Sequence, residues 1–374
     1  MYRAPLDAKK VAQEAVDAVR ETTNAPLAQC HEAVLEVLRL LSPHIDNTAF
    51  STINQEVLEY EPNIDNCYDL RTLSSICETL YEIFMEKQEL SYSSSQNDGD
   101  LCKGLEIFCD ITRKTDPRIP LKIVSAMDFD WISQLLTVLQ MDQDTHVRLA
   151  SIEAITALLP CSETIQQMLI ESRLPIILVD ITSLPFNIEE NSPSEISPFK
   201  RLQINALKLL SKLYTTNIPP TLDHLNYLNS EYFARLFQSL KFFDGTDVFE
   251  LCVNLIYVLD ETSLSFSAVT DPIINDPIAC TDFGHVVISE INQKVTKRRL
   301  HFLEQIINLG KNVLEDMFYS NDLGVLARVL ARECLNQEEQ SNRRLCSTCL
   351  RKLVELDITG IADDSLVTEA LEQN

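Results

Sequence analysis

Apolar residues recur at spacings of three and four along most of the chain, the pattern of a helix with one buried face. The clearest stretch is residues 317–335, MFYSNDLGVLARVLARECL, whose apolar positions share one face: Leu323, Leu326, Ala327, Leu330 and Cys334. Arg328 and Arg332 fall on the opposite face, one turn apart. Ser320, Asn321 and Asp322 are candidate N-caps because their side chains can accept from the free amides of a first turn.

A second amphipathic helix follows directly, and its apolar stripe consists of Leu345, Cys346, Cys349, Leu353 and Leu356. Two short helices joined by a polar turn cannot bury their apolar faces alone. We therefore expect a further helical layer on each side of this pair.

The same pattern predicts helices over most of the remaining chain. In the first half they cover residues 6–22, 25–42 with Asn24 as the cap, 48–59, 68–87, 101–111, 129–139, 147–159, a short helix capped by Ser162, and 175–181. In the second half they cover residues 199–214, 232–242, 248–259, 286–309, 312–318, 323–335, 341–356 and 363–371. Three polar or irregular stretches, residues 91–99, 185–198 and 263–284, are predicted to be loops inserted between helices.

These helical pairs recur about every 35–45 residues, the repeat length of armadillo and HEAT proteins. The chain has only seven glycines, and this scarcity also favours helices over sheets and nucleotide-binding loops. We therefore predict an all-α fold, an armadillo/HEAT-like α-solenoid that forms a single elongated domain over residues 1–374. The alternative is a compact globular helical domain.

The charge balance narrows the class of partner. The net charge is −25, which argues against nucleic acid and against an anionic membrane surface as partners, because both need basic side chains. Residues 286–357 hold 11 basic and 10 acidic side chains, whereas all other residues hold 20 and 46. A locally basic end on an acidic body indicates a protein partner, although an ordinary solvated surface gives the same balance.

Eleven cysteines lie singly within apolar stripes, as free cysteines do in reduced cores. The first residues contain no apolar signal segment, and no apolar run approaches the ~20 residues of a membrane span. The prediction is a cytoplasmic protein.

No motif with a catalytic or ligand-binding mechanism is evident. Cys346 and Cys349 have zinc-like spacing, but both belong to a helical stripe and no second ligand pair lies nearby. Asp142 and Asp144 lack the glycine and glutamate of a calcium loop. Phosphate-binding, dinucleotide-binding and nucleophile-elbow motifs are missing. We therefore expect a protein without enzymatic activity, cofactor or metal, in which Trp131 packs in the core.

Basic side chains are the candidates for partner binding. If residues 286–309 form one helix, Lys294, Lys297, Arg298 and His301 share a face, with Arg299 beside them; Arg344 and Arg351 share another face seven residues apart. The full candidate set is Lys294, Lys297, Arg298, Arg299, Arg328, Arg332, Arg344 and Arg351. Arginine is suited to bidentate capture of a partner's carboxylates. The alternative is neutralisation by acidic residues of the chain itself.

The stretch FYSNDLGVLARVLARECLNQEEQSNRRLCSTCLRKLVEL resembles the late signature of the WISH/DIP family, and residues 244–261, DGTDVFELCVNLIYVLDE, resemble that family's preceding core helix. The resemblance covers residues 244–357, and the chain length is similar to that of the short fungal Dip-type members. It implies an armadillo fold that binds and activates the actin-related protein 2/3 complex without a preformed filament. The linear filaments so formed, with actin an indirect partner, would seed branched networks at cortical endocytic actin patches.

Two features limit what the resemblance carries over. The tail DDSLVTEALEQN is acidic but lacks the tryptophan with which WASP-type activators end, so activation would have to use the folded surface. The Src-homology-3 module and proline-rich segment of longer animal members are also missing. The competing interpretation is a generic armadillo-type adaptor that binds another protein.

Overall fold

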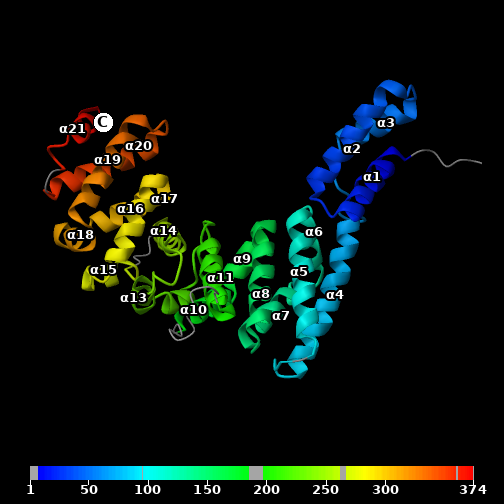
Figure 1. Ribbon diagram of the computed structural model, residues 1–374, viewed down its shortest axis with the longest axis horizontal. Helices are drawn as coiled ribbons and strands as arrows, with labels where there is room; N and C mark the ends of the chain where they lie inside the picture. The colour runs from blue at the N-terminus through cyan, green and yellow to red at the C-terminus, as the bar shows by residue number, and fades with distance from the viewer. Residues whose placement is uncertain (1–6, 95, 185–196, 262–266, 359–360, 374) are drawn as a thin grey trace, which may run out of the picture. The chain divides into compact units, whose positions relative to one another are not determined.

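The computed structural model describes residues 7–94, 96–184, 197–261, 267–358 and 361–373. Within these ranges the secondary structure consists of α-helices and two short 3-10 helices, with no β-strand. The predicted all-α fold is therefore confirmed (Figure 1). The packing of the chain separates two compact units, residues 1–168 and 169–374, and each unit is described by itself. That the whole chain forms a single domain stays a prediction.

The first unit contains the N-terminal helices: α1 (Ala8–Thr23), α2 (Leu27–Leu41), α3 (Thr48–Leu58), α4 (Tyr68–Glu89), α5 (Asp98–Lys114), α6 (Arg118–Ala126), α7 (Asp130–Met141) and α8 (Thr145–Leu158), with short 3-10 turns η1 (Ser42–His44) and η2 (Leu159–Cys161). Helices α1, α2 and α3 pack on one another, α4 packs on α5, α6 and α7, and α8 packs on α5 and α7. Helix α9 (Glu163–Glu171) spans the division between the two units.

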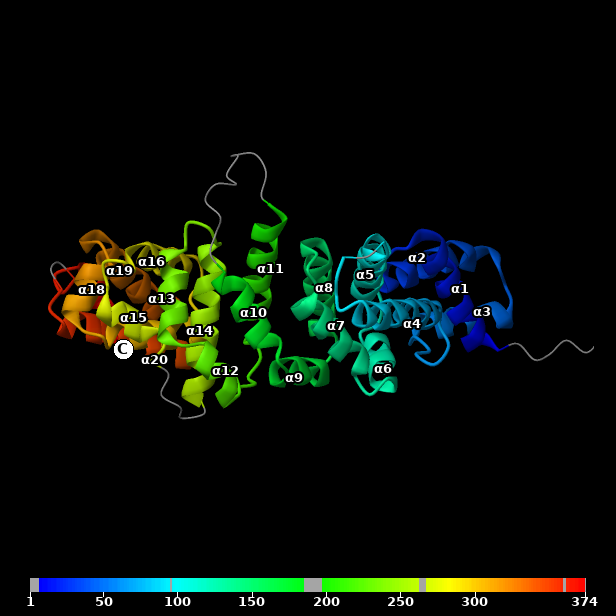
Figure 2. The ribbon, with the colours of Figure 1, turned by 90° about the horizontal axis from the view of Figure 1, so that it is seen from below.

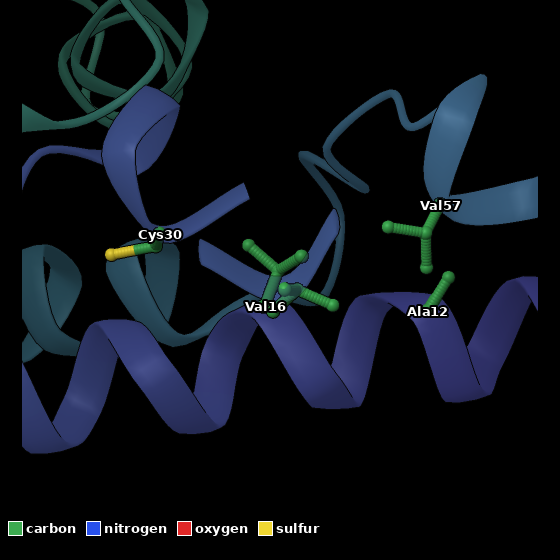
Figure 3. Close-up of a cluster of buried hydrophobic side chains, with 5 residues drawn as sticks. Ala12, Val16, Cys30 and Val57 are labelled. Carbon is green, nitrogen blue, oxygen red and sulfur yellow. The ribbon is translucent and has the colours of Figure 1, made fainter. Parts of the chain in front are cut away.

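Small apolar side chains allow the first three helices to approach closely. Ala12 and Val16 rise from α1, and Ala12 points toward Val57 of α3 (Figure 3). Cys30 and Val34 of α2 complete this buried cluster. Such small side chains leave little space between helix backbones, so the three helices form one tightly packed layer.

The buried side chain of Lys87 forms ionic contacts that hold parts of the first unit together. The Lys87 ammonium lies 2.5 Å from a carboxylate oxygen of Asp98 and 2.8 Å from one of Asp142, and it donates to the Ser93 carbonyl at 3.2 Å. Burial lowers the pKa of Lys87, but the hydrogen bonds to Asp142 and Asp98 outweigh it and leave the pKa raised. A buried charge must be paired in this way because an isolated one is strongly unfavourable. The acidic pair considered as a calcium loop therefore includes a partner of a buried lysine.

The second unit is built from layers of three helices: α10 (Leu174–Ser183), α11 (Pro198–Leu213), α12 (Leu222–Tyr227), α13 (Ser230–Gln238), α14 (Gly245–Glu261), α15 (Thr270–Asn275), α16 (Thr281–Gln293), α17 (Lys297–Ile307), α18 (Lys311–Met317), α19 (Ser320–Asn336), α20 (Gln340–Glu355) and α21 (Ser365–Gln373). Every third helix packs on the next, in the order α11, α14, α17, α20, which we call the helix ladder. Figure 2 shows α10 beside α11 at one end of this unit.

The ladder helices begin at residues 198, 245, 297 and 340, so their starts are 47, 52 and 43 residues apart. A structural repeat in which each layer contacts its neighbours is the arrangement of an α-solenoid. Two of these spacings exceed the predicted period of 35–45 residues and the third lies within it, and each layer contains a short third helix in addition to the predicted pair.

Several predicted boundaries were wrong for local reasons. Asn24 closes α1 in a left-handed conformation with φ 53°, and its amide donates to the Arg20 carbonyl, so it is a C-cap and not an N-cap. Helix α19 starts at Ser320, three residues before the predicted range 323–335, and Tyr319 is its N-cap. Asp322, a candidate cap, lies in its first turn 3.4 Å from the His285 ring. Helix α15 lies inside the predicted loop 263–284.

The predicted loop 91–99 is shorter than expected, because α5 already begins at Asp98. Most of the predicted loop 185–198 lies outside the described residues. The predicted helix over residues 286–309 is two helices, α16 and α17. They separate at Lys294, whose backbone is extended, and the Thr296 hydroxyl accepts from the Arg299 amide to start α17.

Candidate functional surface

Polar contacts connect neighbouring helices of the ladder. Lys352 of α20 reaches Glu304 of α17 at 2.7 Å, and Arg299 of α17 reaches Glu250 of α14 at 2.5 Å. The Tyr257 hydroxyl of α14 also accepts a hydrogen bond from Lys297 of α17 at 3.1 Å. These contacts fix how α14, α17 and α20 lie against one another, and they use several of the basic side chains that the sequence indicated for partner binding.

Arg298 and Arg299 are placed inside the fold. Arg298 donates to the Asn254 side chain at 2.7 Å and to the Tyr214 carbonyl at 3.2 Å. Arg299 has a side chain that is only 12% exposed, and it also lies 2.9 Å from a Glu290 carboxylate oxygen. Both guanidinium groups therefore hold α17 to its neighbours. Because the predicted helix breaks before Thr296, Arg298 and Arg299 do not share one helical face with Lys294.

Arg328 and Arg332 lie on the exposed side of α19, as the pattern predicted. Arg328 pairs with Asp364, located before α21, at 2.7 Å, and this contact lowers the pKa of the Asp364 carboxyl. Arg332 lies 3.3 Å from its neighbour Glu333. Exposed pairs of this kind contribute about 0–1 kcal/mol to stability, so both arginines can exchange these contacts for a partner's carboxylates.

Arg344 and Arg351, like Lys294, are candidates that are exposed without a side-chain partner among the described residues. They lie two turns apart on the outer face of α20, with Thr348 between them. Lys294 is also exposed, at the end of α16. The α20 face, defined as Arg344, Thr348 and Arg351, is thus the predicted basic site that the structure leaves most open to a partner.

Nine of the eleven cysteines predicted to pack in apolar stripes are buried, and Cys102 and Cys161 are half-buried. Cys346 and Cys349 are fully buried on the inner face of α20. The Cys346 thiol forms a hydrogen bond with Cys334 of α19, which lowers the pKa of Cys334 and raises that of Cys346. Trp131 is likewise fully buried, and its indole donates to the Cys77 carbonyl at 3.2 Å. Among the described residues no group of histidine, cysteine or acidic side chains is arranged to hold a metal ion.

A basic surface on α11 was missed by the sequence analysis. Arg201, Lys208 and Lys212 are all exposed on this helix. The apolar stripe of residues 199–214 was recognised, but the charges on its opposite side were not weighed. The available signal was the lack of any acidic residue between 196 and 222.

Comparisons with known proteins leave the family open. No protein-family model matches the chain, and no curated protein matches it with significant similarity. None of the described helices is both long and apolar enough to cross a membrane.

Proposed function

We propose that this protein binds the actin-related protein 2/3 complex with its folded helical surface and promotes nucleation of linear actin filaments without a preformed filament. The observation that carries the proposal is the folding of residues 244–357, which hold the resemblance to the WISH/DIP family. They form the packed run from α14 to α20 and leave the α20 face exposed. The stretch that resembles the family's signature thus includes the exposed α20 face.

The mechanism we propose is a shift of population. A rigid surface that binds the active arrangement of the complex better than the inactive one moves the equilibrium toward the active state. Changing a 1:99 ratio to 99:1 needs roughly 5.5 kcal/mol of differential binding. A helical stack whose layers are fixed by the ladder contacts can contribute this as binding energy, without a chemical step.

A polymerisation assay with the purified chain, the actin-related protein 2/3 complex and monomeric actin tests this proposal. We expect faster polymerisation without added filaments, and unbranched first filaments in single-filament fluorescence microscopy. Arg344→Glu with Arg351→Glu should reduce the rate, because the α20 face then repels carboxylates of the complex. The matched control is Lys9→Glu with Lys103→Glu, which makes the same charge change on exposed sites of α1 and α5.

Two results would contradict the proposed activation of the actin-related protein 2/3 complex. New filaments that appear only as branches on existing ones, or no effect at saturating protein, would remove the activator proposal. The second candidate function, an adaptor for another protein, is favoured by the same exposed arginines and would then take its place. Pull-down from a cell extract followed by identification of the bound subunits distinguishes the two.

A further inference from the structure

Helix α11 carries a one-sided charge that the actin proposal does not use. Residues 196–222 contain four basic side chains and no acidic one. The chain as a whole has a net charge of −25, so the residues outside this segment carry −29. A segment whose net charge is opposite in sign to that of the rest of the chain can select a partner by charge.

The charges lie on a single face. The buried positions of α11 include Leu202, Ala206, Leu209, Leu210 and Leu213, which pack toward α10 and α14. Arg201, Lys208 and Lys212 are exposed, and their spacings of seven and four residues put them on one side of the helix. At 1.5 Å rise per residue they are separated along the axis by about 10 Å and about 6 Å.

The residues that the structure describes offer this face little neutralisation. None of these three side chains forms an ion pair or a hydrogen bond with another described residue, and Asp247 of α14 is a carboxylate whose charge interacts with Lys208 and Lys212. Asp247 is partly buried, and burial raises its pKa to about 6, while Lys208 and Lys212 lower it. Among the described residues, one carboxylate beside Lys208 and Lys212 leaves the face of Arg201, Lys208 and Lys212 with a net positive charge.

We propose that the outer face of α11, defined as Arg201, Lys208 and Lys212, binds an acidic α-helix of a protein partner. The linear array with helical spacing matches carboxylates that recur every four and seven residues on a second helix. Nucleic acid fits less well, because a long polyanion meets the −29 of the remaining chain. A lipid surface fits less well because the face lacks the exposed aromatic or large apolar side chains of membrane-bound helices.

The test uses the full chain and a synthetic alanine-based helical peptide with glutamates at spacings of four and seven. The variant is Arg201→Gln with Lys208→Gln and Lys212→Gln, and its control is Lys9→Gln with Lys103→Gln and Arg113→Gln, three exposed sites in the first unit. We expect the α11 variant to weaken peptide binding about tenfold, since it removes three exposed charge pairs with the peptide. The control variant should bind like the natural chain, and binding should weaken as salt increases.

Three results would overturn the inference. One is equal peptide affinity for both variants, and another is equal affinity for a peptide whose glutamates are spread around the helix. The third is loss of duplex DNA or phosphatidylserine-vesicle binding in the α11 variant while its peptide binding is unchanged. A melting curve of each variant verifies the fold, because removing Lys208 and Lys212 also affects Asp247. The assay contains no actin and no actin-related protein 2/3 complex, so its outcome is separate from that of the proposed function.

Discussion

At the residue scale, Asp247 is a carboxyl group whose environment opposes its charge. It lies in the first turn of α14, one of its oxygens is buried without a hydrogen bond to a described residue, and burial raises its pKa from 3.8 to about 6. The folded state therefore holds this proton up to a higher pH than the unfolded state does. Its contribution favours folding below about pH 4 and is lost as the pH rises to about 6.

The substitution Asp247→Asn should consequently stabilise the protein at neutral pH. Because the side chain is partly solvated, we expect a gain of about 1 kcal/mol at pH 7 and none at pH 4. Urea denaturation at several pH values measures it. Asp46→Asn changes an exposed carboxylate before α3 and should show no such pH dependence. A gain of equal size at both pH values would show that the charge of Asp247 is not the cause.

Leu330 of α19 tests the predicted apolar stripe. It is fully buried, so Leu330→Asp puts an unpaired charge into the core and should destabilise the second unit by about 4 kcal/mol or more. Leu255→Asp in α14, equally buried, should behave in the same way. Leu222→Asp is the control, since this leucine is 73% exposed and its replacement should change stability by less than about 0.5 kcal/mol. Thermal melting of the three variants compares them, and unchanged melting of both core variants would contradict the assignment of faces.

At the element scale, helix α16 passes very close to the end of α18. A Cβ atom added at Gly284 would lie 2.6 Å from the Met317 carbonyl oxygen, a backbone atom that cannot turn aside. Gly284→Ala should therefore destabilise the protein by about 2 kcal/mol through overpacking. Gly324→Ala in α19 is the matched control and should instead stabilise the protein. The space around Gly324 is open, and alanine favours the helix over glycine by about 1 kcal/mol. Opposite shifts in denaturant midpoint are expected; equal shifts would contradict the close contact.

The sequence predicted where helices form better than it predicted how those helices connect and pack together. Periodic stripes such as that of α19 identified the buried side correctly, because the spacing of apolar residues depends on the helix alone. The break before α17 depends on Thr296, a capping residue within an otherwise continuous pattern. The pairing of Lys87 with Asp142 joins residues 55 positions apart, and only knowledge of which helices pack together identifies it. The same reason explains why Arg298 and Arg299 were taken for surface residues.

At the scale of the whole molecule, each of the two units has its own buried interior. In the first, α1 to α8 supply the core, and in the second the ladder and its neighbouring helices do so. Stability in stacked helical layers is roughly a sum of layer and neighbour terms. A substitution such as Leu330→Asp should therefore act mainly on the layers that contact α19.

The distribution of the cysteines has a practical consequence. All eleven are free, nine are buried, and they are spread over both units: Cys30, Cys67, Cys77, Cys102, Cys109, Cys161, Cys252, Cys280, Cys334, Cys346 and Cys349. A buried thiol reacts with an alkylating reagent only when its layer opens. Mass-spectrometric labelling over time would therefore record the opening of individual layers in the natural chain, with Cys102 and Cys161 as the early-reacting references and no introduced probe.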